Sequence, residues 1–349
     1  MICSVLSQYG INDKESTVQV LSSGLINTTW KVNTKGKDYI LQKLNDQVFK
    51  RPQDIDHNLV KLKTYLQAAH PDYLFVAPLP SKDGKSLIDG EDGYFRLFDF
   101  IDGSHTIDSV NTPEEAFEAA RQFGKFSRLL AGFDADQLTY PLPDFHNLTL
   151  RYKQFLKACD RASAERISKS DAEIQFIKEH GDIADTYENI LKEKALPYRV
   201  IHHDTKISNV LFDHDQKGLC VIDMDTVMPG LYISDVGDMM RTYLSPANEE
   251  ETDPDKISIR LEFFKAIYQG YMSEMGPILS EAEKAYFTYS GEFIIYMQAI
   301  RFLTDYLNED IYYGARYPEH NLNRAINQIT LLTAYLKEKE HFKLLTSEA

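Results

Sequence analysis

The spacing of apolar and polar positions changes near residue 101 of the 349-residue chain. Before that point the apolar residues form short runs, such as residues 17–21, 28–32 and 94–101, separated by turns that contain glycine. Runs of this length, alternating or rich in β-branched and aromatic residues, predict β-strands. Residues 54–67 are different, because their apolar side chains recur at near-helical intervals and predict a helix.

Beyond residue 101 the spacing is mostly helical. Residues 112–115 read Thr-Pro-Glu-Glu, a helix cap with proline in the first turn, and a core-facing apolar stripe follows. Four later stretches show similar periodicity: 172–196, 257–275, 280–307 and 319–338. The pattern predicts an α+β fold with two lobes, a small β-rich N-terminal lobe (residues 1–101) and a larger, mostly helical C-terminal lobe (residues 102–349), joined by a hinge alone.

In the second part, strand patterns return only around one polar loop. Residues 200–201 end a short strand, and residues 202–209 are too polar to continue it. Two further strand signals follow, at residues 210–212 and 219–222, with a turn between them. The loop and the last strand end are therefore predicted to bring four polar side chains to a common edge: Asp204, Lys206, Asn209 and Asp223.

These residue types suit the transfer of a nucleotide γ-phosphate to a hydroxyl, a reaction that depends mainly on positioning and charge neutralisation. Asp204 is the candidate base for the attacking hydroxyl, and Lys206 would balance the charge of the transferring group. Asn209 and Asp223 offer hard oxygen ligands to Mg²⁺, with Asp225 as a further carboxylate. Turn formers and helix caps are the alternative reading, but the ordered spacing between strands favours catalysis.

The spacing His-x-Asp-x-Lys-x-x-Asn at residues 202–209 resembles the catalytic loop of protein kinases, and Asp223 stands where those enzymes carry Asp-Phe-Gly. Met224-Asp225 replaces Phe-Gly here. Together with Asp-Val-Gly-Asp at 235–238, this departure resembles the aminoglycoside phosphotransferase and choline kinase superfamily. More closely, the chain resembles the bacterial N-acetylhexosamine 1-kinases, through segments that span nearly its whole length: 24–29, 39–42, 202–211, 222–230, 235–238, 301–307 and 317–322.

The resemblance implies a bilobal, protein-kinase-like fold, ATP and Mg²⁺ as cofactors, and the anomeric hydroxyl of an N-acetylhexosamine (GlcNAc or GalNAc) as the phosphate acceptor. It implies that adenine bonds to the hinge backbone between Asp99 and Ile101. A flap over the nucleotide phosphates is expected to use Gly24, Asn27 and Thr28.

The third predicted strand, residues 38–43, departs from the kinase pattern. Gln42 occupies the position of the phosphate-anchoring lysine. Three possibilities follow: Gln42 contacts the phosphates itself, Lys43 or Lys31 substitutes for the lysine, or the anchor is absent.

Polar and aromatic residues gather near the C-terminal end of the chain. Arg301 and Asp305 share one helix face, and Tyr317 follows a short loop. The resemblance implies that these residues hold the sugar. Spacing alone favours an ion pair between Arg301 and Asp305 that pins two helices together. Asp235 is expected to be a structural acceptor that braces the catalytic loop.

The composition of the chain argues against several classes of binding partner and metal site. Lys and Arg number 38 against 53 Asp and Glu, a net charge of −15 that argues against a nucleic-acid or anionic membrane surface. The three cysteines are far apart, as is typical of free thiols in a reducing compartment. No segment is apolar enough to span a bilayer, so a cytoplasmic location is expected. His202, His203 and His214 lack the spacing of a zinc site, and His202 is expected to be structural.

Two alternatives differ from the leading reading. A kinase with another small acceptor, such as choline, a hydroxy amino acid or an aminoglycoside, would keep the mechanism, but a cationic acceptor needs an acidic cleft and the last region is rich in arginine. The second alternative, a catalytically silent, kinase-like regulatory protein, is left open by the glutamine at position 42. It is opposed by the intact set of Asp204, Lys206, Asn209 and Asp223.

Overall fold

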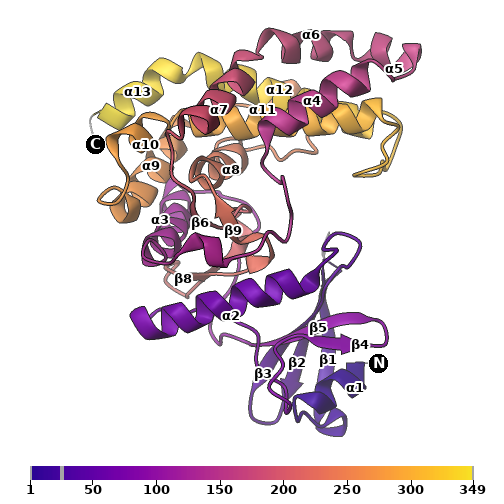
Figure 1. Ribbon diagram of the computed structural model, residues 1–349, viewed down its shortest axis with the longest axis vertical. Coiled ribbons are helices and arrows are strands. Elements are labelled where there is room, and N and C mark those ends of the chain that lie inside the picture. Colours follow the sequence, from indigo (N-terminus) through magenta and orange to yellow (C-terminus); the bar gives the residue numbers. More distant parts are fainter. Residues whose placement is uncertain (1, 24–26, 348–349) are drawn as a thin grey trace. The chain divides into compact units, whose positions relative to one another are not determined.

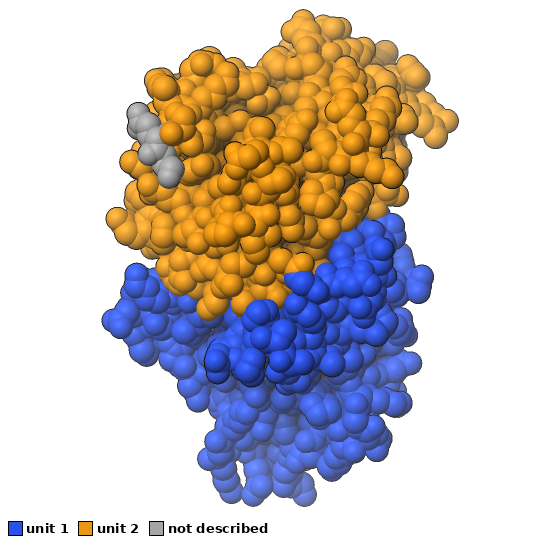
Figure 2. Space-filling view, turned by 60° about the vertical axis from the view of Figure 1, so that its left-hand side comes forward, with its two compact units in different colours: residues 1–106, 132–143, 211–229 blue, residues 107–131, 144–210, 230–349 orange. Residues whose placement is uncertain are grey.

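The computed structural model describes residues 2–23 and 27–347 (Figure 1). The chain forms two compact units, coloured separately in Figure 2. Unit 1 comprises residues 1–106, 132–143 and 211–229, and unit 2 comprises residues 107–131, 144–210 and 230–349. The single hinge at residue 101 stays a prediction, and two later segments of the chain, residues 132–143 and 211–229, also belong to unit 1.

Hydrogen bonds of one buried side chain explain why the later segments belong to unit 1. Asn58 lies on helix α2 (Pro52–Ala69) and donates to the carbonyls of Thr139 and Val227, each at 3.0 Å. Its own oxygen accepts the Thr139 amide at 2.9 Å. Because a buried amide must find partners, Asn58 fixes both returning segments to α2.

Unit 1 contains a five-stranded antiparallel sheet in the order β1-β2-β3-β5-β4. The strands are β1 (Ser16–Ser23), β2 (Thr28–Thr34), β3 (Asp38–Lys43), β4 (Ile88–Gly90) and β5 (Gly93–Asp99). Helix α1 (Ile2–Gln8) packs on this sheet through Val5 and Leu6, which share a buried apolar cluster with Val32, Leu41 and Phe95. The strands predicted at 17–21, 28–32 and 38–43 are confirmed, as is the helix predicted at 54–67, which is α2. The strand predicted at 94–101 is also present, but it ends at Asp99.

Unit 2 is mostly helical, so the α+β prediction is confirmed (Figure 1). Its helices are α3 (Pro113–Leu129), α4 (Leu148–Cys159), α5 (Ala164–Lys169), α6 (Asp171–Glu179), α7 (Asp182–Glu193), α8 (Ile233–Tyr243), α9 (Leu261–Met275), α10 (Glu281–Ala285), α11 (Tyr289–Leu307), α12 (His320–Lys337) and α13 (Lys339–Ser347). Helix α3 begins with the predicted cap, in which the Thr112 side chain accepts the Glu115 amide. The stretches predicted at 172–196 and 280–307 each contain two helices instead of one.

Helix α11 is the buried centre of unit 2 and packs against α4, α8 and α12. Its contact with α8 depends on Gly237, because a Cβ atom at that position would lie 2.1 Å from the Ser290 carbonyl oxygen. Helices α3 and α9 approach in the same way at Gly270, where a Cβ would lie 2.2 Å from the Phe117 carbonyl oxygen. At both contacts a glycine lets the two helix backbones approach closely, because no side chain lies between them.

Short strands surround the polar loop as predicted. They are β6 (Arg199–Ile201), β7 (Val210–Phe212) and β8 (Gly218–Val221), of which β7 and β8 pair with each other. Two 3-10 turns, η3 (Ile207–Asn209) and η4 (Met224–Thr226), and a short strand β9 (Met228–Gly230) were not expected from the sequence. Two further 3-10 turns of this kind are η2 (Ala135–Gln137) and η5 (Pro254–Lys256). Among the described residues, no helix combines the length and apolar character needed to cross a membrane.

Candidate active site

The loop between β6 and β7 brings Asp204 and Lys206 together within unit 2. The Lys206 Nζ lies 3.2 Å from Asp204 Oδ1, and both side chains are partly exposed to solvent. The negative charge of Asp204 raises the pKa of Lys206, so the lysine is a permanent cation at neutral pH. A carboxylate and a cation therefore lie side by side with both side chains accessible to solvent.

Asn209 ends the loop and is oriented by the loop backbone. Its Nδ2 donates to the Asp204 carbonyl at 2.9 Å, and the side chain is 7% exposed. This bond commits the nitrogen end of the amide, so Oδ1 is the end suited to a cation. Asn209 thus fits the predicted role of a hard oxygen ligand for Mg²⁺.

Helix α8 holds the backbone of residues 202–209, the loop that the sequence predicts to be catalytic and that is called the catalytic loop below, through two aspartates. Asp235 accepts the amides of His202 at 2.9 Å and His203 at 2.7 Å, and Asp238 accepts the Thr205 amide at 2.8 Å. The bonds from His202 and His203 confirm the prediction that Asp235 braces the loop.

Asp235 is fully buried, and this burial raises its pKa to about 7. The two backbone amides that it accepts act in the opposite direction, because they favour the charged carboxylate. The brace of the catalytic loop therefore contains a carboxyl group that titrates near neutral pH.

The two loop histidines are packed inside unit 2. His202 is buried and meets the Phe123 ring edge-on at 5.2 Å, consistent with a structural role. His203 has a φ of 66° and lies beside His146, with ring centroids 5.4 Å apart. Burial lowers the pKa of His146 well below its ordinary value, with His203 and Arg301 adding to the effect. His146 is therefore a neutral ring next to the catalytic loop.

Asp223 follows β8 in unit 1 and has an exposed side chain. Its backbone is in the left-handed region, with φ 59° and ψ 61°, a conformation that aspartate tolerates better than most residues. An exposed carboxylate at a strand end is the kind of group that Mg²⁺ uses. Asp223 therefore fits its predicted role as a metal ligand.

Asp225 is in a different environment, because its side chain is only 2% exposed. It forms an ion pair with Arg96 of β5, with 2.5 Å between Nη1 and Oδ1, and it accepts a hydrogen bond from Asn27 Nδ2 at 2.7 Å. The charge of Asp225 is thus balanced inside unit 1. The sequence pattern did not single out Arg96, although an arginine flanked by the apolar Phe95 and Leu97 was an available signal.

The predicted phosphate-binding positions lie along β2 and β3. Thr28 and Lys43 are cross-strand partners, and Lys43 extends over the Phe95 ring at 5.9 Å. Gln42 accepts two hydrogen bonds from Arg96. Lys31 pairs with Asp38 at 3.0 Å, so it is already neutralised. Gly24, the remaining flap residue, lies outside the described residues.

At the predicted adenine hinge, several groups already have partners. The Phe100 amide donates to the Asp38 carbonyl at 3.1 Å, and Asp99 pairs with Lys37 at 2.6 Å. The Ile101 carbonyl accepts both the amide and the hydroxyl of Ser104. These bonds fix the path of the chain as it leaves β5.

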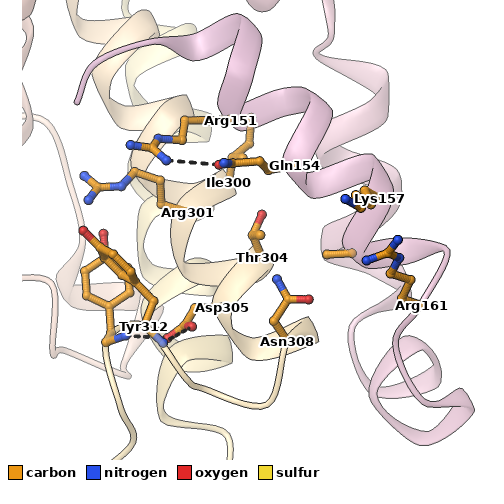
Figure 3. Close-up of a pocket in the computed structure, with 12 residues that line it drawn as sticks. Arg151, Gln154, Lys157, Arg161, Ile300, Arg301, Thr304, Asp305, Asn308 and Tyr312 are labelled. Carbon is orange, nitrogen blue, oxygen red and sulfur yellow. Dashed lines mark hydrogen bonds between the residues drawn. The ribbon is translucent and has the colours of Figure 1, made fainter. Parts of the chain in front are cut away.

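A pocket of about 480 Å³ lies between α4 and α11 within unit 2 (Figure 3). Arg301 and Asp305 are part of its lining, whereas Tyr317 is not, and its ring packs against His320. The complete lining is Arg151, Gln154, Lys157, Ala158, Arg161, Ile300, Arg301, Thr304, Asp305, Asn308, Tyr312 and Tyr313.

Asp305 does not pair with Arg301. Its carboxylate accepts the backbone amides of Tyr312 at 2.7 Å and Tyr313 at 2.9 Å, and thereby shapes the loop after α11. Arg301 instead donates to Gln298 and packs against the rings of Phe145 and Tyr313. The prediction of an ion pair between these two residues is wrong, because the loop amides engage the carboxylate.

The lining of the pocket is strongly cationic. Its four basic residues form no ion pair with any carboxylate among the described residues, and Figure 3 shows Arg151 and Arg301 side by side. Desolvation and the nearby Arg301 charge lower the pKa of Arg151. The Phe145 ring on which Arg301 packs also lies 6.4 Å from the His203 ring, so one aromatic layer separates Arg301 from the catalytic loop. The four basic residues are Arg151, Lys157, Arg161 and Arg301.

Solved structures of kinases share this fold. A spectinomycin phosphotransferase in complex with ADP and spectinomycin matches with a TM-score of 0.62 and 15% identity, over 96% of this chain and 98% of that one. A microcompartment-associated aminopropanol kinase matches at 0.64 and 19%, over 98% and 97%. A choline kinase from Cryptosporidium parvum matches at 0.55 and 16%, over 97% and 95%. The kinase-like fold implied by the sequence is confirmed.

The family model described as the phosphotransferase enzyme family matches residues 17–260. The matched region begins in β1 and ends just before α9, so it contains nearly the whole sheet of unit 1, the catalytic loop and α8. We conclude that the chain belongs to this phosphotransferase family.

Proposed function

We propose that the protein is an ATP- and Mg²⁺-dependent kinase that phosphorylates the anomeric hydroxyl of an N-acetylhexosamine. The observation that carries the proposal is the braced catalytic loop, in which Asp204 and Lys206 form an accessible pair in a member of a phosphotransferase family. The ADP in the spectinomycin phosphotransferase structure supports a nucleotide as the phosphate donor.

In this proposal Asp204 accepts a hydrogen bond from the acceptor hydroxyl and takes its proton as the oxygen attacks. Lys206 offsets the negative charge of the transferring phosphoryl group. Asn209 and Asp223 would hold Mg²⁺, which when bound would neutralise charge on the phosphate oxygens. Asp225, with its charge balanced by Arg96, is assigned to support rather than to direct metal binding.

The pocket between α4 and α11 supports a sugar over an amine as the acceptor. An ammonium group would meet the unpaired positive charges of Arg151 and Arg301, and Asp305 is already engaged by backbone amides. Arginine donors and the tyrosine rings of the pocket suit the hydroxyl and acetamide groups of a neutral sugar. The pocket therefore disfavours cationic acceptors such as choline and aminopropanol, the compounds after which two of the structural relatives are named.

An ADP-release assay over GlcNAc, GalNAc, glucose, choline and aminopropanol tests the proposal, with phosphorus NMR of the product. We expect turnover of an N-acetylhexosamine to its 1-phosphate, and little turnover of the 1-O-methyl glycoside, which lacks the reacting hydroxyl. Comparable turnover of the methyl glycoside or a 6-phosphate product would exclude the anomeric position. Preferred turnover of choline or aminopropanol would exclude the sugar.

A further inference from the structure

Two departures from the protein-kinase pattern meet in one place inside unit 1. Gln42 stands where kinases have the lysine of the third strand, and Asp225 stands where they have the glycine of Asp-Phe-Gly. Arg96 contacts both residues: Nε and Nη2 donate to Gln42 Oε1 at 3.1 and 2.9 Å, and Nη1 pairs with Asp225 at 2.5 Å. One arginine thus links the two unusual positions.

The geometry of the strands explains how Arg96 reaches both residues. Gln42 on β3 and Arg96 on β5 are direct cross-strand partners, so their side chains emerge on the same face of the sheet. The guanidinium uses its planar fork, with one edge on the amide oxygen and the remaining nitrogen on the carboxylate. A lysine at position 42 would place a second cation against Arg96, so glutamine is the residue that suits this neighbour.

The ion pair between Arg96 and Asp225 is buried, so the loss of either partner would leave an uncompensated charge inside unit 1. The side chains of Arg96 and Asp225 are 3% and 2% exposed, and an unpaired charge at such a site is strongly unfavourable. Asn27 completes the network, because its Nδ2 donates to Asp225 and its Oδ1 accepts the Asn45 amide at 3.1 Å. The segment that carries Asp225 is therefore connected to β3, β5 and the residue before β2.

Asp223 lies two residues before Asp225 and needs such support. Its left-handed backbone conformation is unfavourable for a residue with a side chain and persists only when the surroundings hold it. The turn η4 that follows Asp223 contains Asp225, and the Arg96 pair fixes that turn against the sheet. Groups that orient a metal ligand in this way strengthen metal binding without touching the metal.

We propose that Arg96 is a positioning residue which, through Asp225, holds Asp223 in the geometry for Mg²⁺-nucleotide binding. Arg96 thereby takes the structural role that a lysine on the third strand has in protein kinases. The proposal rests on the proposed kinase function. Kinases with the usual pattern join a lysine on this strand to a helix glutamate. In this chain the cation has moved one strand along the sheet, and its carboxylate partner has moved into the metal-binding segment.

The critical variant removes both charges and keeps side-chain bulk: Arg96→Met combined with Asp225→Leu. Replacing a buried ion pair by apolar residues of similar size is often neutral for stability, so the double variant separates positioning from folding. Arg96→Lys is the conservative variant, which keeps a charge for Asp225 but loses the fork that holds Gln42. The matched control is Arg128→Met with Glu274→Leu, an ion pair between α3 and α9 in unit 2.

The main readout is calorimetric binding of the ATP analogue AMP-PNP at a series of Mg²⁺ concentrations, with melting temperature measured alongside. We expect the double variant to melt near the wild type and to lose affinity for Mg²⁺-AMP-PNP by about 10- to 100-fold, the usual effect of losing support for a metal ligand. Arg96→Lys should show a smaller loss, and the control pair should bind like the wild type. Hydrogen exchange without nucleotide should be faster at residues 223–227 in the double variant.

The possible outcomes separate this inference from the proposed function. A folded double variant with wild-type Mg²⁺-dependent binding would overturn the role of Arg96 and leave the kinase assignment standing. If the double variant does not fold, unchanged Mg²⁺ dependence in Arg96→Lys would overturn it equally. If the wild type itself binds AMP-PNP without any Mg²⁺ dependence, the proposed function fails instead.

Discussion

Asp204 differs from the other carboxylates around the catalytic loop in being accessible. Its side chain is 23% exposed, whereas Asp235 and Asp238 are buried and committed to backbone amides. A side chain on whose contacts the fold does not depend can be replaced with little loss of stability. At the scale of single residues, solvent exposure therefore distinguishes the candidate catalytic carboxylate from the carboxylates that support the loop.

Asp204→Asn should reduce kcat by about 10²–10⁴, because the amide cannot accept the proton of the attacking hydroxyl. Nucleotide affinity should stay close to the wild-type value, since the proposed partner of Asp204 is the acceptor. Steady-state kinetics and calorimetric titration with ATP measure the two quantities. Asp215→Asn, in the exposed turn between β7 and β8, is the control, and near wild-type kcat in the Asp204 variant would refute the assignment.

Arg301→Ala tests whether the pocket between α4 and α11 holds the acceptor. A polar pocket binds its ligand more weakly when one of its donors is missing, so KM for the sugar should rise more than KM for ATP. The exposed Arg316 provides a matched Arg316→Ala control outside the pocket lining. Equal changes in both KM values would assign the pocket a role other than acceptor binding.

At the scale of elements, α8 acts as the support of the catalytic loop and gives it a pH dependence. Burial raises the pKa of Asp235 to about 7, above the value near 3.8 of an unfolded chain, so the folded state binds this proton more tightly. The resulting stability is fully present below about pH 4 and is lost as pH rises through 7. The full shift corresponds to at most about 4 kcal/mol.

Asp235→Asn should therefore weaken the fall in unfolding free energy between pH 4 and 8. The variant also loses one acceptor for a backbone amide, so it should be less stable than the wild type across the range. Urea unfolding at several pH values gives the slope for both proteins. An identical slope in the variant would show that Asp235 does not titrate in this window.

The close contact between α8 and α11 predicts that one added methyl group at Gly237 lowers the stability of the protein. Gly237→Ala would place a Cβ 2.1 Å from a backbone oxygen that cannot rotate away, so the helices must separate. We expect a loss of about 1–3 kcal/mol in unfolding free energy, and reduced kcat because the brace moves. Gly36→Ala, where no atom lies within 4 Å of the new Cβ, should change stability by less than about 0.5 kcal/mol. Equal stability of the two variants would contradict this account of the packing.

At the scale of the whole molecule, ligand binding and stability are linked. A ligand that binds only the folded chain raises the unfolding free energy by about 2.7 kcal/mol when its concentration is 100 times Kd. ATP with Mg²⁺ should therefore raise the melting temperature, and EDTA should remove most of the increase. The Asp223→Ala variant should show no Mg²⁺-dependent increase, because a predicted metal ligand is missing. A melting temperature that rises equally with and without Mg²⁺ would contradict the metal requirement.

The local pattern of residues determined the class of the fold and the layout of the catalytic loop. Strands and helices depend on periodicities of two and 3.6 residues, which are visible in a single sequence, and the loop motif places Asp204, Lys206 and Asn209 within eight residues of chain. Even here the expected helices at 172–196 and 280–307 proved to be pairs, because helix ends depend on neighbours as well as on periodicity.

The tertiary structure decided which charges are balanced and which are left for a ligand. Asp225 is neutralised by Arg96 from a distant strand, and Asp305 is engaged by loop amides rather than by Arg301 one helical turn away. Likewise, residues 132–143 and 211–229 join unit 1 through contacts such as those of Asn58. Such pairings join residues far apart in the chain, or choose between equally spaced local partners. Periodicity and spacing therefore carry no information about them, and only the folded chain selects one.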